Sequence, residues 1–214
     1  MNIRISIYDF FAYTIPGGVY LFIGLYALSQ LGILNFDFVS FNPSFFQLVI
    51  IAGSAYILGM LMEPIAKLWY GLFKPKDFPE KVLKGFQENR PHIEVKFKAT
   101  DWPILMAYIR RENMEMAEYI ERDNASNLML RSLSFALFIF AIVQAIEFAI
   151  SLAILHLIAG VLSGFFSIVA VKFSLKFASW FYLLIYEVTT ARVLPGLDKV
   201  TLRDKAEEPE QSKT

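Results

Sequence analysis

Residues 133–171 read LSFALFIFAIVQAIEFAISLAILHLIAGVLSGFFSIVAV, and this stretch decides the fold class. Its strongly polar side chains are only Gln144, Glu147 and His156. One crossing of the hydrocarbon core of a bilayer needs about 20 apolar residues. The stretch is long enough for two crossings joined by a tight turn, and a soluble protein has no core deep enough to hide it. We therefore predict a transmembrane hairpin.

The composition of the whole chain agrees with a membrane protein. Of its 214 residues, 56% are hydrophobic and 19% are charged, whereas soluble domains average about 45–50% apolar and about 25% charged residues. Lys and Arg number 20 and Asp and Glu number 20, so the formal net charge is zero. Without a basic excess, direct binding of nucleic acid is not expected. Cysteine is absent, which excludes disulfides and thiolate metal sites.

Two further apolar runs, Phe10–Leu34 and Phe45–Trp69, bring the number of predicted spans to four. We place the third span near Arg131–Leu152 and the fourth near Gly160–Tyr182. The predicted fold class is an all-α membrane protein with four transmembrane helices in two hairpins and a cytosolic helical insert. The predicted parts are a first hairpin at 1–73, the insert at 74–131, a second hairpin at 132–182, a helix end at 183–197 and a disordered tail at 198–214.

The insert is the main polar region of the chain. We predict a short amphipathic helix from Phe78 to Gln87, opened by Pro79. A second helical pattern runs from Trp102 to Asp123, where apolar residues recur at helical spacing against charged ones. We expect this helix to lead nearly directly into the third span, with or without a break at 124–127.

The distribution of Lys and Arg predicts the orientation in the membrane. The insert contains six Lys and five Arg, and the chain from Lys172 onward contains seven more. The connections within the two hairpins contain none. Because cytoplasmic loops carry the excess of Lys and Arg, we expect a multi-pass protein of the plasma (inner) membrane with the insert and both termini in the cytoplasm.

Polar side chains within the spans are candidate functional residues, because an intramembrane charge is costly and usually faces the bundle interior or water. Glu147, with Gln144 three residues before it, predicts an ion or proton site or a polar contact between subunits. Alternatively, Glu147 lies close enough to the outer boundary to reach water. Lys172 either pairs inside the bundle or extends to the interface. Glu63 either marks the inner mouth of the second span or lies at a helix end.

Small residues at four-residue spacing mark faces on which transmembrane helices pack closely. The chain offers two such pairs, Gly160 with Gly164 and Ala55 with Gly59. Packing within one bundle and self-association between subunits are both compatible with them. Helix-breaking residues that could kink the first two spans are Pro16, Gly17, Gly18 and Pro64.

The insert also offers basic side chains for a partner protein or an anion, namely Arg110, Arg111, Lys96 and Lys98. The insert carries ten acidic residues against its eleven basic ones, which fits a mixed solvated surface equally. The sequence contains no phosphate-binding loop, dinucleotide glycine motif, nucleophile elbow or zincin motif. We therefore expect no enzyme activity, cofactor or metal.

The residues Tyr8-Asp9-Phe10-Phe11 through Pro16-Gly17 resemble the opening of small prokaryotic four-span membrane proteins that are often encoded in anti-phage defence neighbourhoods. The stretch from Glu121-Arg122 to Arg131-Ser132 is also similar. The resemblance covers these two motifs and the layout of the spans. It implies a membrane effector or sensor that works with a cytosolic partner.

The sequence favours a non-enzymatic protein that forms homo-oligomers in the lipid bilayer and binds a cytosolic protein through residues 74–131. Such a protein would act as a scaffold, a sensor or a membrane-disrupting effector. The alternative is a small ion channel or transporter with a path lined by Gln144 and Glu147. A lipid-modifying enzyme fits less well, because the spans offer too few polar groups at one depth.

Overall fold

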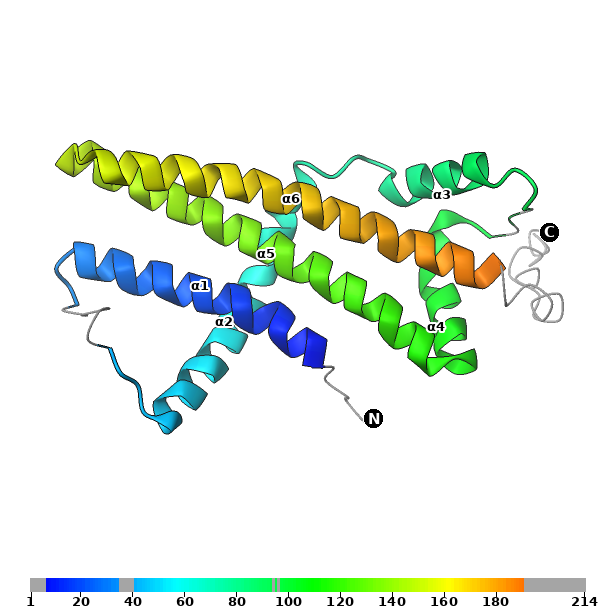
Figure 1. Ribbon diagram of the computed structural model, residues 1–214, viewed down its shortest axis with the longest axis horizontal. Coiled ribbons are helices and arrows are strands. Elements are labelled where there is room, and N and C mark those ends of the chain that lie inside the picture. Colours follow the sequence, from blue (N-terminus) through cyan, green and yellow to red (C-terminus); the bar gives the residue numbers. More distant parts are fainter. Residues whose placement is uncertain (1–6, 35–40, 94, 96, 191–214) are drawn as a thin grey trace, which may run out of the picture. The chain divides into compact units, whose positions relative to one another are not determined.

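The computed structural model describes residues 7–34, 41–93, 95 and 97–190, and this part of the chain contains helices and no strand. The all-α prediction is therefore confirmed. Four of the helices are long and apolar enough to cross a membrane. The helices, labelled in Figure 1, are α1 (Ile7–Gln30), α2 (Phe45–Gly71), α3 (Phe78–Asn89), η1 (Ala99–Asp101), α4 (Trp102–Glu112), α5 (Met114–Ser151) and α6 (Ile154–Val188).

Local side-chain bonds set several helix boundaries. At the start of α2, the Ser44 hydroxyl accepts from the Gln47 N–H at 3.4 Å, and the Ser44 N–H donates to Gln47 Oε1 at 2.8 Å. This reciprocal pair satisfies two amide groups that a helix start leaves unpaired. The predicted helix at 78–87 is confirmed as α3.

The predicted continuous helix from Trp102 to Asp123 is wrong, because the chain breaks at Asn113. This residue is extended, with φ −150° and ψ 96°. Its Oδ1 accepts from the Met116 N–H at 3.0 Å and so caps the start of α5.

The helix leads directly into the third span as expected, and no break occurs at 124–127, since α5 runs through these positions. Asn127 stays helical because its side chain bonds to α6 rather than to its own backbone. The Ser174 hydroxyl donates to Asn127 Oδ1 at 2.6 Å. An asparagine engaged in this way cannot compete for the helix hydrogen bonds.

The turn between α5 and α6 is shorter than the sequence suggested. It consists of Leu152 and Ala153, and α6 begins at Ile154 rather than near Gly160. Leu152 adopts φ +55°, and its N–H donates to the Phe148 carbonyl at 2.8 Å. Residues 191–197 of the predicted helix end and the predicted tail at 198–214 lie outside the described residues.

The chain divides by packing into two units, which are described separately. The membrane unit is Met1–Phe78 with Glu121–Phe181, and the insert unit is Pro79–Ile120 with Tyr182–Thr214. Helices α5 and α6 each contribute residues to both units.

In the membrane unit, α1 and α2 touch backbone to backbone. A Cβ on Gly17 would overlap the carbonyl oxygen of Ala55, and one on Gly59 would overlap the carbonyl oxygen of Tyr13. Glycine at both positions lets the helices cross this closely, and beyond the crossing they splay apart (Figure 1).

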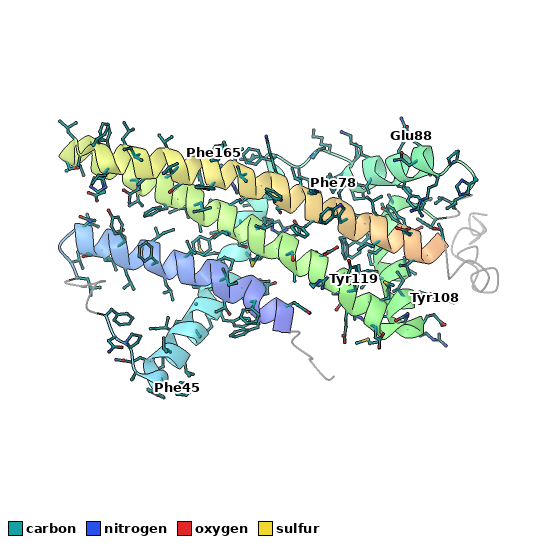
Figure 2. The ribbon with its side chains drawn as sticks, in the orientation of Figure 1. Phe45, Phe78, Glu88, Tyr108, Tyr119 and Phe165 are labelled. Carbon is teal, nitrogen blue, oxygen red and sulfur yellow. The ribbon has the colours of Figure 1, made fainter. Side chains whose placement is uncertain are left out.

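The apolar core of the membrane unit contains Tyr20 and Ile23 of α1 with Ala136 of α5. Large apolar side chains also cover the outside of this unit. Phe45, at the start of α2, is 82% exposed, and Phe165 of α6 is 59% exposed (Figure 2). An exposed apolar surface of this extent indicates contact with hydrocarbon rather than water.

The insert unit is built around Tyr186 near the end of α6, whose side chain is fully buried. Its ring lies 6.2 Å from that of Phe86 and 5.5 Å from that of Phe97, measured between centroids. Arg90 donates to Glu187 at 2.7 Å. Aromatic packing therefore holds the end of α6 against α3 and the segment before α4.

Candidate functional site

A buried ion pair joins α2 and α5 in the membrane unit. Arg131 of α5 donates from Nη2 to Glu63 Oε1 of α2, and only 9% of the Arg131 side chain is exposed. The guanidinium also lies over the ring of Tyr70, with its Cζ 5.7 Å from the centroid. Glu63 and Tyr70 are seven residues apart, which places them two turns apart on one face of α2. The guanidinium of Arg131 therefore packs against this face of α2.

Hydroxyl and indole groups continue the network next to Arg131. The Trp69 Nε1–H of α2 donates to Ser134 Oγ at 3.1 Å, and the Ser134 hydroxyl donates to the Arg131 carbonyl at 2.9 Å. From α6, the Ser167 hydroxyl donates to the Ser134 carbonyl at 2.7 Å. One turn of α5 is therefore bonded to two other helices.

Helix α1 joins the same turn of α5 through Tyr20. Its hydroxyl donates to the Ser132 carbonyl at 2.8 Å, and its ring lies 6.4 Å from that of Phe135. The residues that form this polar cluster come from all four long helices, and they are Tyr20, Glu63, Trp69, Tyr70, Arg131, Ser132, Ser134 and Ser167.

The polar groups of this cluster bond to one another and so hold the four long helices in place. The hydroxyls of Ser134 and Ser167 donate to backbone carbonyls, and the carboxylate of Glu63 accepts from Arg131. A charge in this environment is costly unless its counter-charge stays in place. Among the described residues, no three His, Cys, Asp or Glu side chains gather where they could hold a metal ion.

Comparison of the chain with protein-family models, curated proteins and solved structures finds no match. The function must be argued from the geometry of the chain itself.

Gln144 lies in the seam between α5 and α6, and only 3% of it is exposed. Its Oε1 is 2.8 Å from His156 Nδ1. This contact links the two helices close to the turn that joins them. Glu147, one turn further along α5, is half-buried. Sequence reasoning did not pair Gln144 with His156, because the fourth span was predicted to begin near Gly160.

The small residues named from sequence lie at helix contacts within one chain. A Cβ on Gly160 would be 3.4 Å from the Ala141 carbonyl oxygen of α5, and one on Gly164 would be 3.9 Å from the Ala141 Cβ. Ala55 and Gly59 lie at the α1–α2 crossing together with Gly17. Gly18, in contrast, faces open space.

The remaining predicted residues do not join the polar cluster. Lys172 is exposed on α6. Helices α1 and α2 continue as α-helix through Pro16 and Pro64, so neither proline ends its helix. Whether these prolines bend the helices stays a prediction.

Three of the four basic residues named in the insert are exposed. Arg110 and Arg111 are exposed in the last turn of α4, where cations are favourable at a helix C-terminus. Lys98 is exposed, and its backbone N–H donates to Asp101 Oδ2 at 2.8 Å. Lys96 lies outside the described residues. A role in binding a partner stays a prediction for all four.

Sequence reasoning named Glu63 but missed its partner, Arg131, and the side chains around it. A signal existed. Glu63 was placed at the inner end of the second span and Arg131 at the inner start of the third. Both were therefore expected at the same depth in the bilayer. An intramembrane carboxylate calls for a cation at that depth.

Proposed function

We propose that this chain is a non-enzymatic, multi-pass protein of the plasma membrane that couples a cytosolic protein to a bundle of two transmembrane hairpins. Residues 74–131 form the cytosolic insert that binds the partner, both termini are cytoplasmic, and several copies associate in the bilayer. The protein acts as a scaffold or sensor, in which binding of the partner to the insert changes the arrangement of the helices in the bundle. In a membrane-disrupting effector, the same coupling would open the bundle.

The continuity of α5 is the observation that carries this proposal. The helix runs without a break from Met114 to Ser151, so it begins in the insert unit and continues through the membrane unit. In the membrane unit, its turn at Arg131–Ser134 is bonded to α1, α2 and α6. A rotation or shift of α5 imposed by a partner would therefore strain contacts with every other span.

The strength of these contacts supports coupling rather than loose tethering. Removing one member of a buried ion pair leaves an uncompensated charge, which costs about 3–5 kcal/mol. Interfaces of this kind have discrete arrangements and do not deform continuously. The resemblance of the chain's opening to proteins of anti-phage defence neighbourhoods makes phage infection the first condition in which to look for the partner.

The test replaces α3 to α4, residues 78–112, by a flexible linker of equal length and leaves α5 intact. Photo-crosslinking in cells is then used to compare the proteins captured by the full chain and by the linker variant. We expect both chains to reach the membrane and only the full chain to capture a cytosolic protein. Capture of the same protein by the linker variant would contradict the assigned role of the insert.

A second measurement tests the coupling itself. Nitroxide labels on exposed positions of α2 and α6 report the distance between these helices with and without the captured partner. We expect the partner to shift this distance in the native chain. We expect no shift in the double variant Glu63→Leu with Arg131→Met, in which the ion pair is replaced by apolar side chains. Equal shifts in both chains would disprove coupling through the polar cluster.

A further inference from the structure

The splayed ends of α1 and α2 enclose an apolar groove. Its volume is about 530 Å³. Its lining residues follow the close crossing at Gly17 and Gly59 along both helices. The two helices diverge on one side of their crossing (Figure 1). The groove is lined by Gly18, Leu21, Phe22 and Leu25 of α1, by Gln47, Ile50, Ile51 and Ser54 of α2, and by Phe41 before α2.

We propose that this groove binds one acyl chain of a phospholipid, with the ester end of the lipid at Gln47. The inference is independent of the function proposed above and depends only on α1 and α2 crossing the bilayer.

The size of the groove fits a single hydrocarbon chain. A methylene takes up roughly the volume of a water molecule in the liquid, about 30 Å³, so about 530 Å³ holds roughly 18 carbons. That is the length of one acyl chain of a bilayer lipid.

The groove is mostly apolar and has one carboxamide at the end away from the crossing. Leucine, isoleucine and phenylalanine side chains form most of its walls, Ser54 lies next to the crossing, and Gln47 lies in the first turn of α2. The Gln47 oxygen accepts from the Ser44 N–H at 2.8 Å, so the amide nitrogen is the donor left for an ester oxygen. A transmembrane helix from a second copy would instead present apolar side chains to this polar end.

The charge near the groove selects a neutral or zwitterionic lipid. The described residues between α1 and α2, 31–34 and 41–44, include no Lys or Arg. Binding of anionic headgroups to membrane proteins depends on clusters of these residues. We therefore assign phosphatidylcholine-like or phosphatidylethanolamine-like lipids rather than phosphatidylglycerol.

The glycines of α1 and α2 provide variants that fill the groove without disturbing the crossing. A Cβ on Gly18 would meet no atom within 4 Å, so Gly18→Leu places its side chain in the groove. Gly24 has the same open surroundings on the same helix but does not line the groove. Gly24→Leu is therefore the matched control. Ser54→Leu fills the groove from α2, and Gly53→Leu is its control for the same reason.

The experiment reconstitutes the full chain in phosphatidylcholine vesicles that contain a phosphatidylcholine with a diazirine in one acyl chain. After illumination, mass spectrometry compares labelling at Leu21 and Ile50 with labelling at Phe165 and Ile168, which are exposed on α6. We expect about tenfold more labelling in the groove, equivalent to about 1.4 kcal/mol of preference. Gly18→Leu and Ser54→Leu should remove the excess, and both control variants should keep it.

Equal labelling of the groove and of the α6 surface would overturn the proposal, because the groove would then hold only exchanging bulk lipid. Retention of the excess in both Gly18→Leu and Ser54→Leu would overturn it as well. So would crosslinks between Ile50 residues of two copies in place of lipid adducts. Stronger labelling by a phosphatidylglycerol probe would overturn the assignment of a zwitterionic lipid. Thermal unfolding of each variant verifies that it is folded before labelling is compared.

Discussion

Arg131 of α5 and Glu63 of α2 form an ion pair inside the membrane unit, with 9% and 23% of their side chains exposed. Neither residue would be stable there alone, because hydrocarbon and packed protein solvate an isolated charge poorly. The pair fixes which face of α2 meets α5. It also places Trp69 and Tyr70 of α2 against the same turn of α5.

Substitution of either partner should destabilise the protein strongly. We expect Arg131→Met or Glu63→Leu alone to lower the free energy of unfolding in detergent by about 3–5 kcal/mol. The double variant should recover most of this loss, because no unpaired charge remains. A double-mutant cycle followed by denaturant unfolding measures the coupling.

Lys84 and Glu88 provide the control pair, since they lie 3.8 Å apart on α3 with 79% and 67% of their side chains exposed. Their removal should change the free energy of unfolding by less than about 1 kcal/mol. Similar losses for the exposed and the buried pair would show that burial does not strengthen the Arg131–Glu63 interaction.

The close crossing of α1 and α2 should not tolerate a methyl group. Gly59→Ala places a Cβ against the Tyr13 carbonyl, so the helices must separate, and we expect a loss of about 1–3 kcal/mol in unfolding free energy. Gly53→Ala, on the same helix in open space, should instead stabilise by about 0.5–1 kcal/mol through reduced backbone entropy. Opposite signs for the two substitutions are the expected result, and a loss for both would mean that Gly53 is also in contact.

The hydrogen bond from Tyr20 to α5 should make a smaller contribution. Tyr20→Phe removes the donor to the Ser132 carbonyl, and hydrogen bonds between transmembrane helices average about 0.6 kcal/mol with a maximum of about 1.7. Tyr26→Phe is the control, because its ring is held by contacts with Phe22 and Phe140. Melting temperatures in one detergent compare the two, and a larger loss for Tyr26→Phe would contradict the role of the Tyr20 hydroxyl.

The orientation predicted from Lys and Arg can be measured directly because the chain contains no cysteine. Glu88 of α3 and Asn42 before α2 are exposed and accept a single cysteine each. In intact cells, we expect a membrane-impermeant maleimide to label Asn42→Cys and not Glu88→Cys. In inside-out vesicles the result should reverse. Labelling of Glu88→Cys from outside would contradict the cytosolic position of the insert.

Glu147 separates the scaffold from the channel hypothesis. If the protein is a scaffold, Glu147→Gln should leave proton and potassium flux through reconstituted vesicles unchanged, since no conducted ion depends on that carboxylate. Gln144→Leu should also leave flux unchanged while it removes the bond to His156. A loss of flux in Glu147→Gln with normal assembly would favour the channel alternative.

The sequence was sufficient for the four long apolar helices and for α3, because hydropathy and helical periodicity are sums over neighbouring residues. It missed the break at Asn113 and left a break at 124–127 open, and the same residue type, asparagine, has opposite effects at these two places. Asn113 caps α5 through its own side chain, whereas Asn127 is occupied by Ser174 of α6. Only the neighbouring helix distinguishes the two cases, and a local pattern does not contain it.

For the candidate site, the sequence alone determined that Glu63 is a costly charge within an apolar span, and that Ala55 and Gly59 form a pair of small residues suited to close helix packing. Only the tertiary structure decided that Arg131 neutralises Glu63, that Gly17 and Gly59 form a crossing, and that Gly18 borders an open groove. The physical reason is that burial in hydrocarbon is a property of each segment, whereas charge pairing and backbone contact depend on which segments meet and at what rotation.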